Sequence, residues 1–339
     1  MSESVSLQKT HREGMTRRDF ARVAGMSAAG MVLPGLIAGA AAAQPAQAPG
    51  LTKVFIQAVK EARLFDLSHV WDETSPIAGV NPPFSMTLNA THASTISLFD
   101  GHLSFTSEVM NWSGQHGAPS IDAIGHIGRD GLLFGGVDAF AATSDPQGIG
   151  RSGVGAHLDI AHYPTDLLVN RGVLLDVASF IQGDLTPLPP GFEITGQHLA
   201  DTAAAQGTAL EPGDTVLIRT GWGQHFVGDP TLYKGDASPG PGVDGAQFLI
   251  AHGARVVGND TLTFEKRPPI IFQPVFQIFP VHMLLIADHG IFIIENFFLE
   301  ELAQARVYEF LVVIPPLKVR GGTGSALRAF ALSPKPPAG

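Results

Sequence analysis

The strongest constraint on the fold is a series of short apolar segments rich in β-branched residues, which alternate with longer segments of helical pattern. Short apolar segments of this kind are typical of buried strands. The predicted strands are Val173–Val177, Thr215–Arg219, Val256–Gly258, Ile291–Ile294 and Tyr308–Ile314, after an opening strand and turn at Phe65–His69. The predicted helices are Val54–Arg63, Thr195–Gln206 with Gly207 as a stop, Gly242–His252 and Glu295–Gln304. The sequence therefore predicts an α/β or α+β domain with a mixed, β-rich sheet.

The composition agrees with a single globular domain over residues 49–339. Hydrophobic residues make up 45% of the chain and charged residues 15%, and 39 glycines and 25 prolines imply many turns. A net charge of −10 disfavours nucleic-acid binding, which needs clustered basic residues. The chain has no cysteine, which excludes disulfides and cysteine nucleophiles. The absence of GxSxG and of GxGxxG after a first strand disfavours a serine hydrolase of the α/β-hydrolase type and a nicotinamide enzyme.

The first 48 residues have the pattern of an export signal. Arg17 and Arg18 form a twin-arginine motif, and a stretch rich in small and apolar residues follows from Ala24 to Ala43. Candidate cleavage sites lie near Ala43 and Ala48. The alternative is a transmembrane anchor, but the stretch is weakly hydrophobic and Pro34 interrupts it. We expect a periplasmic or secreted protein that acts on a small molecule and has no membrane contact after signal cleavage.

Histidine and carboxylate residues occur in distant segments in a pattern that suggests a divided metal site. His116, Asp122 and His126 lie close together in sequence, whereas His282 and Glu295 follow much later. Imidazole and carboxylate groups are ligands that Zn²⁺ and Mn²⁺ accept, and an open coordination position would make a bound water more acidic. The last two residues stand in apolar surroundings, where a polar group without a partner is costly.

Each of these residues also has a structural interpretation. A histidine is more often a surface or hydrogen-bonded group than a ligand, Asp122 could cap a turn, and an arginine could pair with Glu295. Asp260 and Thr261 either shape the pocket or form a turn at a strand end. His289 and Asp288 are interpreted as loop residues. Gly321–Ser325 is interpreted as a tight turn near the site, because it lacks the ending of a phosphate-binding loop.

Several fragments in the same order resemble the cyclase family of metal-dependent hydrolases, which includes kynurenine formamidase, isatin hydrolase and other lactone and amide hydrolases. The fragments are Asp66–Ser68, Arg171–Asp176, Gly213–Trp222, Val257–Thr261, His282–Leu285, Glu295–Asn296 and Pro316–Ser325. The resemblance covers nearly the whole chain after the leader. It implies a swivelling β/β/α-type domain, a divalent metal such as Zn or Mn, and assembly as a homodimer or homotetramer.

The family signature HxGTHxDxPxH is only partly present. His116, Asp122 and His126 match its first His, its Asp and its last His, but Ser120 stands at the middle His. The resemblance implies that the first two histidines and the Asp are metal ligands. The last His is either an acid/base or a residue that supports the ligands without contacting the metal. Three outcomes follow from Ser120: a weaker or different metal, a neighbouring His that fills the vacancy, or a non-catalytic relative.

The sequence therefore predicts a metal-dependent hydrolase of a cyclic amide, lactone or N-formyl aryl amine. The predicted metal ligands are His116, Ser120, Asp122, His282 and Glu295, and the predicted catalytic residues are His126 and Glu295. Phe84, Trp112 and Trp222 are predicted to wall an apolar pocket. The alternative is a periplasmic binding or scaffold protein that kept the fold and lost the metal. Ser120 favours this alternative, whereas retention of five compatible residues favours the enzyme.

Overall fold

The computed structural model describes residues 50–77, 79, 81–99, 101–115, 117–143, 153–155 and 157–335. The predicted export signal and His116 lie outside the described residues. The chain divides into two units, Met1–Thr52 and Lys53–Gly339, and the fold described below is that of the second unit. Among the residues with a described structure, no helix has the length and apolar character needed to cross a membrane.

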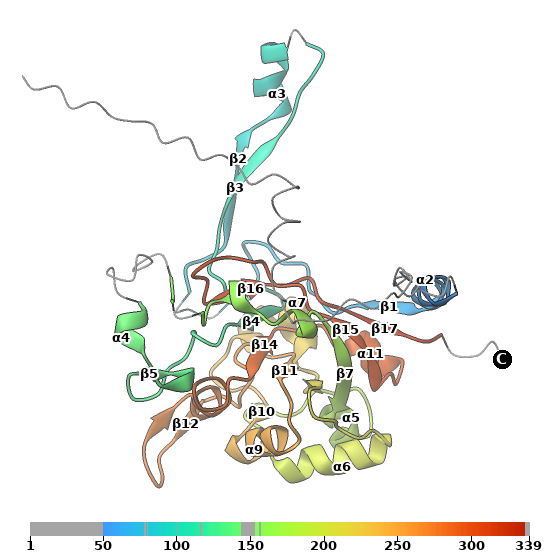
Figure 1. Ribbon diagram of the computed structural model, residues 1–339, viewed down its shortest axis with the longest axis vertical. Helices are drawn as coiled ribbons and strands as arrows, with labels where there is room; N and C mark the ends of the chain where they lie inside the picture. Colours follow the sequence, from blue (N-terminus) through green and yellow to red (C-terminus); the bar gives the residue numbers. More distant parts are fainter. Residues whose placement is uncertain are drawn as a thin grey trace, which may run out of the picture. The chain divides into compact units, whose positions relative to one another are not determined.

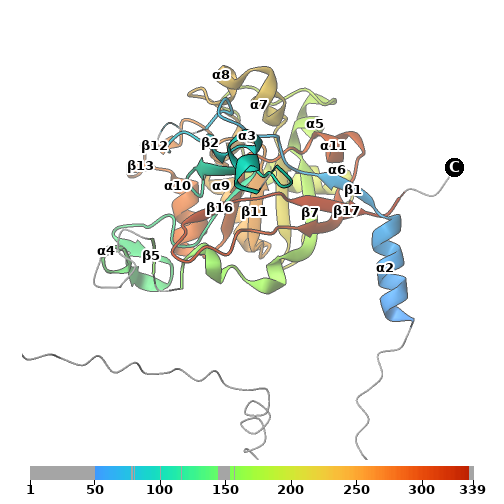
Figure 2. The same cartoon turned by 90° about the horizontal axis from the view of Figure 1, so that it is seen from above.

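A mixed sheet of nine strands forms the centre of the domain. Across the sheet, the strands are β1 (Arg63–Asp66), β17 (Phe330–Ser333), β15 (Glu309–Val313), β7 (Val169–Asp176), β9 (Thr215–Arg219), β11 (Val256–Asn259), β14 (Phe292–Glu295), β4 (Ser120–Asp122) and β16 (Gly324–Ala326). The four strands from β7 to β14 run parallel, and the neighbouring pairs on either side are antiparallel. Figure 2 shows β16, β11, β7 and β17 in this order across the sheet. The mixed sheet confirms the predicted fold class.

Helices cover one face of the parallel strands (Figure 1). They are α5 (Val177–Gln182), α6 (Gly196–Gln206), α9 (Val243–Ala251), α10 (Pro280–His282) and the π-helical turn η8 (Met283–Asp288). Val216 and Ile218 of β9 pack beneath these helices, whereas Leu217 between them belongs to a second core on the other face. Both faces of the central strands are therefore buried, as expected for parallel strands.

Local signals explain the boundaries of the predicted α6 helix. Thr195 and His198 form a reciprocal capping box at the start, and Gly207 ends the helix in the left-handed conformation with φ 66°. The predicted strands likewise correspond to β7, β9, β11, β14 and β15, and the first predicted helix to α2 (Leu51–Glu61).

The predicted helix at Glu295–Gln304 is wrong in its first half. Strand β14 continues to Glu295, and α11 begins only at Glu300 and ends at Gln304. Asn296 between them has φ 61°, a left-handed conformation that cannot continue a helix. Its backbone N–H donates to Thr261, and that of Phe297 donates to Asn259, so this segment is tied to the end of β11 instead.

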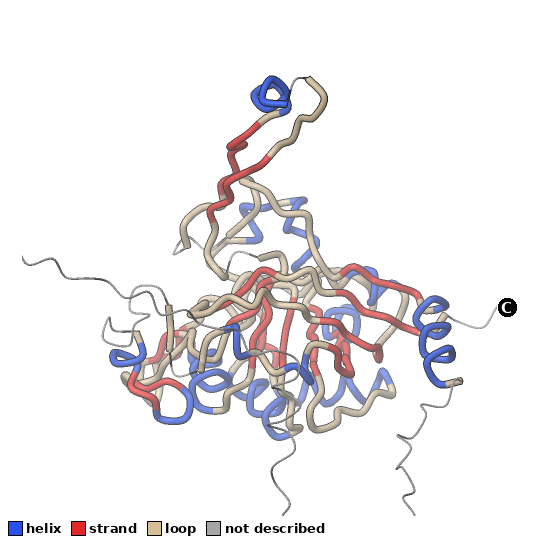
Figure 3. The backbone as a smooth tube through the Cα atoms, turned by 45° about the horizontal axis from the view of Figure 1, so that its top comes forward, coloured by secondary structure: helices blue, strands red, loops and turns tan. Residues whose placement is uncertain are grey.

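Shorter elements surround this framework. The two-stranded pairs are β2 (Ser85–Ala90) with β3 (Ser107–Asn111), β5 (Leu132–Leu133) with β6 (Val137–Asp138), β8 (Glu193–Ile194) with β10 (Gly240–Pro241), and β12 (Ile270–Ile271) with β13 (Gln277–Ile278). The short helices are α3 (His92–Thr95), η1 (Ile96–Phe99), η2 (Phe134–Gly136), α4 (Ala139–Ala142), η5 (Ile160–His162), η6 (Thr165–Leu167), η7 (Trp222–Gln224), α7 (His225–Gly228) and α8 (Pro230–Tyr233). The β2–β3 ribbon projects from the sheet domain and carries α3 near its far end (Figure 3).

Candidate metal centre

Strand register brings the predicted ligands of two distant segments onto one face of the sheet. Glu295 of β14 lies opposite Ser120 of β4, and Ile294 lies opposite Ile121. The two isoleucines point into the core on the helix-free face. Because side chains alternate along a strand, Ser120, Asp122 and Glu295 therefore share the helix-covered face. The site lies at the carboxyl end of a parallel strand, where open α/β sheets commonly bind ligands.

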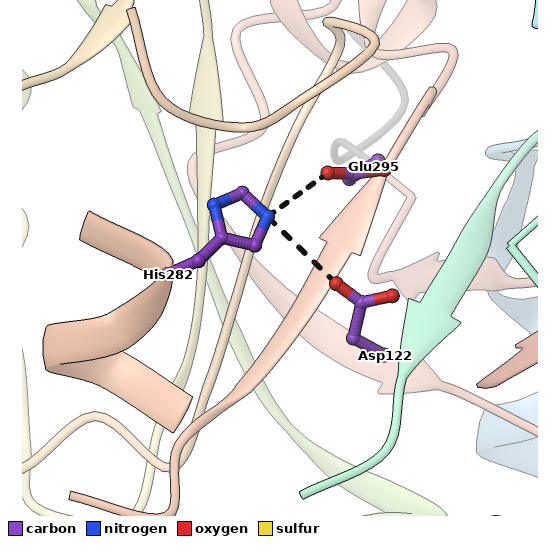
Figure 4. A group of neighbouring side chains, drawn as sticks. All are labelled: Asp122, His282 and Glu295. Carbon is purple, nitrogen blue, oxygen red and sulfur yellow. Dashed lines mark hydrogen bonds and ion pairs between the residues drawn. The ribbon is translucent and has the colours of Figure 1, made fainter. Parts of the chain in front are cut away.

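His282 completes this group from the helical layer. It lies on α10, which begins after Phe279 in a left-handed conformation and has Pro280 in its first turn. Its Nε2 atom is 3.2 Å from Oε1 of Glu295 and 3.8 Å from Oδ2 of Asp122 (Figure 4). One potential ligand atom from each of the three residues lies within 4.8 Å of the others, and all three side chains are almost fully buried.

A fourth acidic residue, Glu265, fixes the orientation of His282. Its Oε1 atom lies 2.6 Å from Nδ1 of His282 and accepts the backbone N–H of the same residue at 3.0 Å, while Oε2 accepts the N–H of Val281 at 3.2 Å. A carboxylate at this position accepts a hydrogen bond from Nδ1–H, and in the neutral imidazole this leaves the lone pair of Nε2 facing Asp122 and Glu295. This carboxylate–histidine pair is the usual support of a metal-binding imidazole.

Sequence reasoning missed Glu265. It stands directly before Lys266 and Arg267, so it reads as part of an exposed run of charges. In the structure Glu265 is only 1% exposed. Only the turn after β11 and the placement of α10 make it a neighbour of His282. Burial is the property that would have identified Glu265, and the sequence pattern does not show that this residue is buried.

The charges of this group fit a bound cation. Three buried carboxyl groups surround a single imidazole. Burial alone would lower the pKa of His282, but its hydrogen bonds with Glu265 and Glu295 and their charges outweigh burial and raise that pKa to about 10. Burial raises the pKa of Glu295 to about 7, against the hydrogen bond from His282 and with a contribution from the charge of Asp122. A divalent cation can take the place of the protons that such a cluster otherwise retains.

His126 lies at the edge of the group. Its Nε2 atom is 3.8 Å from Oδ1 of Asp122, and its side chain is 29% exposed. The side-chain amide of Gln115 lies 3.2 Å from Nδ1 and also donates to the hydroxyl of Thr323. An amide N–H that donates to Nδ1 leaves the proton of a neutral imidazole on Nε2, the atom that faces Asp122. The geometry therefore presents a proton donor toward the site, with access to solvent.

Asp260 does not join the candidate ligands. It is fully buried and accepts hydrogen bonds from the N–H and the hydroxyl of Thr220 at 2.8 and 2.7 Å. Burial raises its pKa, although the charge of Arg219 and the Thr220 hydrogen bonds oppose this. Asp260 therefore joins the ends of β9 and β11, which agrees with the strand-end interpretation.

The predicted aromatic pocket walls separate into two groups. Phe84 and Trp112 both pack against Trp71, with ring centroids 4.5 and 6.4 Å from it. Trp222 is 1% exposed, and its indole N–H donates to the carbonyl of Tyr233. The prediction that Trp222 walls a pocket is therefore wrong, because it is a core side chain with its polar atom satisfied inside the domain.

Comparison with known proteins gives the family. A sequence profile described as "Putative cyclase" matches residues 65–266, more than half of the chain. The chain belongs to the cyclase family. This family assignment confirms the resemblance that the sequence fragments indicated.

Three known proteins resemble this chain at low sequence identity. Isatin hydrolase of Roseibium aggregatum is 26% identical over 292 residues, which cover 81% of this chain and 93% of that protein. A crystal structure described as a novel cyclase has a TM-score of 0.69 at 26% identity and covers 84% of this chain and 93% of its own. An isatin hydrolase bound to the product analogue thioisatinate has a TM-score of 0.62 at 20% identity, with 84% and 98% covered, which is a likeness of fold.

Proposed function

We propose that this cyclase-family protein is a metal-dependent hydrolase that cleaves an amide or ester carbonyl, either in a ring or in an N-formyl aryl amine. The observation that carries the proposal is the convergence of Asp122, His282 and Glu295 on one point, with Glu265 holding His282 from behind. Similarity to isatin hydrolase and to a structure described as a potential metal-dependent hydrolase with cyclase activity supports the reaction class.

In this proposal Asp122, His282 and Glu295 hold a divalent metal, Zn or Mn, and His116 is a further predicted ligand. A metal at this point would polarise the substrate carbonyl and lower the pKa of a bound water. Hydrolysis adds water across the C–N or C–O bond, so the carbonyl carbon becomes a carboxylic acid and the leaving atom gains a proton. His126 is positioned to donate that proton from Nε2. Asp122 keeps the imidazole facing the reacting centre.

Ser120 gives the proposed metal site a weak ligand on one side. It is 2% exposed and directly opposite Glu295 on the neighbouring strand, so it borders the candidate ligands. A neutral hydroxyl is a weaker ligand than imidazole. We therefore expect the metal to lie toward Asp122, His282 and Glu295, with lower affinity than a site with a histidine at position 120.

Further parts of the proposal concern assembly and location. The β2–β3 ribbon exposes Met86, Leu88, Val109 and Met110, and a two-stranded ribbon alone in water is only marginally stable. This supports a homo-oligomer in which a second copy covers the ribbon. The twin-arginine pattern supports export to the periplasm. Size-exclusion chromatography with light scattering tests the first of these, and fractionation of expressing cells tests the second.

The second candidate function is that of a binding protein without catalytic activity, and Ser120 is the observation that favours it. The two functions are separated by assaying purified protein with lactones, cyclic amides and formamides, before and after removal of metal with a chelator. The enzyme hydrolyses at least one class, loses that activity with the metal and regains it on adding Zn²⁺ or Mn²⁺. Tight binding of these compounds by metal-loaded protein without any hydrolysis would establish the binding protein instead.

A further inference from the structure

A second cluster of imidazole and carboxylate groups lies outside the candidate metal centre. Nδ1 of His157 is 2.8 Å from Nε2 of His162, and Nδ1 of His162 contacts Oδ1 of Asp159 at hydrogen-bonding distance. The two histidines border a cavity of about 250 Å³ that is also lined by Arg255 and Phe292. We propose that His157 and His162 bind a second divalent transition metal of the copper or nickel type.

Asp159 holds His162 as Glu265 holds His282. Its side chain is 5% exposed and both of its oxygens are engaged, because Oδ2 accepts the backbone N–H of Gly321 at 2.6 Å. The carboxylate therefore fixes the ring of His162 by accepting a hydrogen bond from Nδ1–H. The lone pair of Nε2 then points toward His157. A carboxylate behind an imidazole in this way is the usual arrangement of a metal-ligating histidine.

The relative placement of the two rings fits a shared cation better than a simple hydrogen bond. A collinear N–H···N bond of this length would place the ring centroids about 5 Å apart. The centroids of His157 and His162 are 4.5 Å apart and the ring planes are inclined by 72°, so the two nitrogen axes meet at an angle. For a cation about 2.0 Å from both nitrogens, the N–metal–N angle would be about 90°. This is the angle between neighbouring ligands in square-planar and octahedral complexes.

The surroundings leave room for the remaining ligands. His157 is exposed, and the side chain of His162 is 47% exposed, so water has access to the point between them. A cavity of this size holds several waters. Arg255 lines the cavity, but its guanidinium is paired with Asp166, which offsets its charge. Two imidazoles with water in the other positions suit Cu²⁺ and Ni²⁺, which bind nitrogen more tightly than Mn²⁺ does.

His157 also has an unusual backbone conformation. Its φ is 61°, a left-handed conformation that costs a residue with a side chain of order 1–3 kcal/mol. This conformation directs the imidazole toward His162. Ile124, which also lines the cavity, is only two residues from Asp122 in the sequence. The test must therefore distinguish the two sites.

The experiment compares metal-free full-length protein with a His157→Ala/His162→Ala variant, in which the first site is intact. Calorimetric titration with CuCl₂ and with NiCl₂ counts the equivalents bound, and the EPR spectrum of the Cu²⁺ protein reports the coordinating nitrogens. We expect the variant to bind one equivalent fewer and its spectrum to lose the signal of that equivalent, while the signal of the first site stays unchanged. Asp159→Asn is expected to weaken this equivalent at least 10-fold without changing its number.

His252→Ala is the matched control, since among the described residues this exposed imidazole interacts with Phe248 of its own helix. It should bind as the original protein does. Circular dichroism of the metal-free proteins checks that each variant folds, and His162→Gln replaces the double variant if it does not. Equal numbers of bound equivalents in the original protein and in the folded His-cluster variant would overturn the proposal and leave a His–His hydrogen bond only.

Discussion

Substitution of Glu265 by glutamine tests how the fold prepares His282. The carbonyl oxygen of a glutamine can occupy only one of the two oxygen positions of Glu265, and at that of Oε2 it still accepts the N–H of Val281, at 3.2 Å. The amide nitrogen then stands at the position of Oε1, beside Nδ1 and the backbone N–H of His282. Its amide, however, is a donor, and donation to Nδ1 moves the proton of a neutral imidazole to Nε2. That proton faces Glu295 at the position where a metal must lie. Loss of such a carboxylate partner typically costs 10- to 100-fold in metal affinity, about 1.4–2.7 kcal/mol.

The assay is competition between the protein and a chromophoric chelator for Zn²⁺ and Mn²⁺, with stability of the metal-free proteins measured by urea unfolding. Glu301→Gln is the matched control, because this exposed residue of α11 lies outside the candidate metal centre. We expect weaker metal binding only in Glu265→Gln. Unchanged affinity in a folded Glu265→Gln protein would refute the orienting role. Equal losses in the two variants would show that the effect is one of net charge.

Three further predictions address the site and its surroundings. Ser120→His should tighten Zn²⁺ binding at least 10-fold in the same competition assay, because imidazole replaces a hydroxyl beside Glu295. His126→Asn should lower kcat by about 10²–10⁴ while the metal content stays the same, and a parallel loss of metal would instead identify His126 as a ligand. Burial lowers the pKa of His69 to about 4, against a hydrogen bond to the backbone of Phe297, so the unfolded chain takes up its proton first as the pH falls below about 6.5. His69→Phe can keep the stacking on Phe226. The free energy of unfolding of this variant, measured with urea, should rise by about 2 kcal/mol relative to that of the original protein as the pH falls from 7 to 5. A constant difference between the two proteins across this range would contradict the argument.

The sequence predicted the central strands well because their apolar, β-branched segments are buried on both faces. Thr195 and Gly207 likewise marked the ends of α6 correctly, since capping is a local interaction. The error at Glu295–Gln304 arose because the left-handed conformation of Asn296 is set by hydrogen bonds to the end of β11. A contact between distant segments overrides the local pattern there.

The candidate site was predictable where the signal lay in residue type. His282 and Glu295 stand out in the sequence as polar residues in apolar segments, and Asp122 by its spacing from His116 and His126. The structure brings Asp122, His282 and Glu295 together. Their roles as ligands stay a prediction, as do those of His116 and Ser120. Glu265 was missed because its function depends on burial behind His282. The cluster of His157, Asp159 and His162 was missed because only the fold turns these side chains toward one another.

The central claim is that Asp122, His282 and Glu295 hold a divalent metal, and the most direct test is elemental analysis. Inductively coupled plasma mass spectrometry is applied to the purified protein and to an Asp122→Asn/Glu295→Gln variant, both carrying His157→Ala/His162→Ala so that the second cluster does not contribute. The account predicts close to one Zn or Mn per chain in the protein with the first site intact and a large loss in the variant. A protein that is metal-free as purified and still empty after incubation with either ion would contradict it.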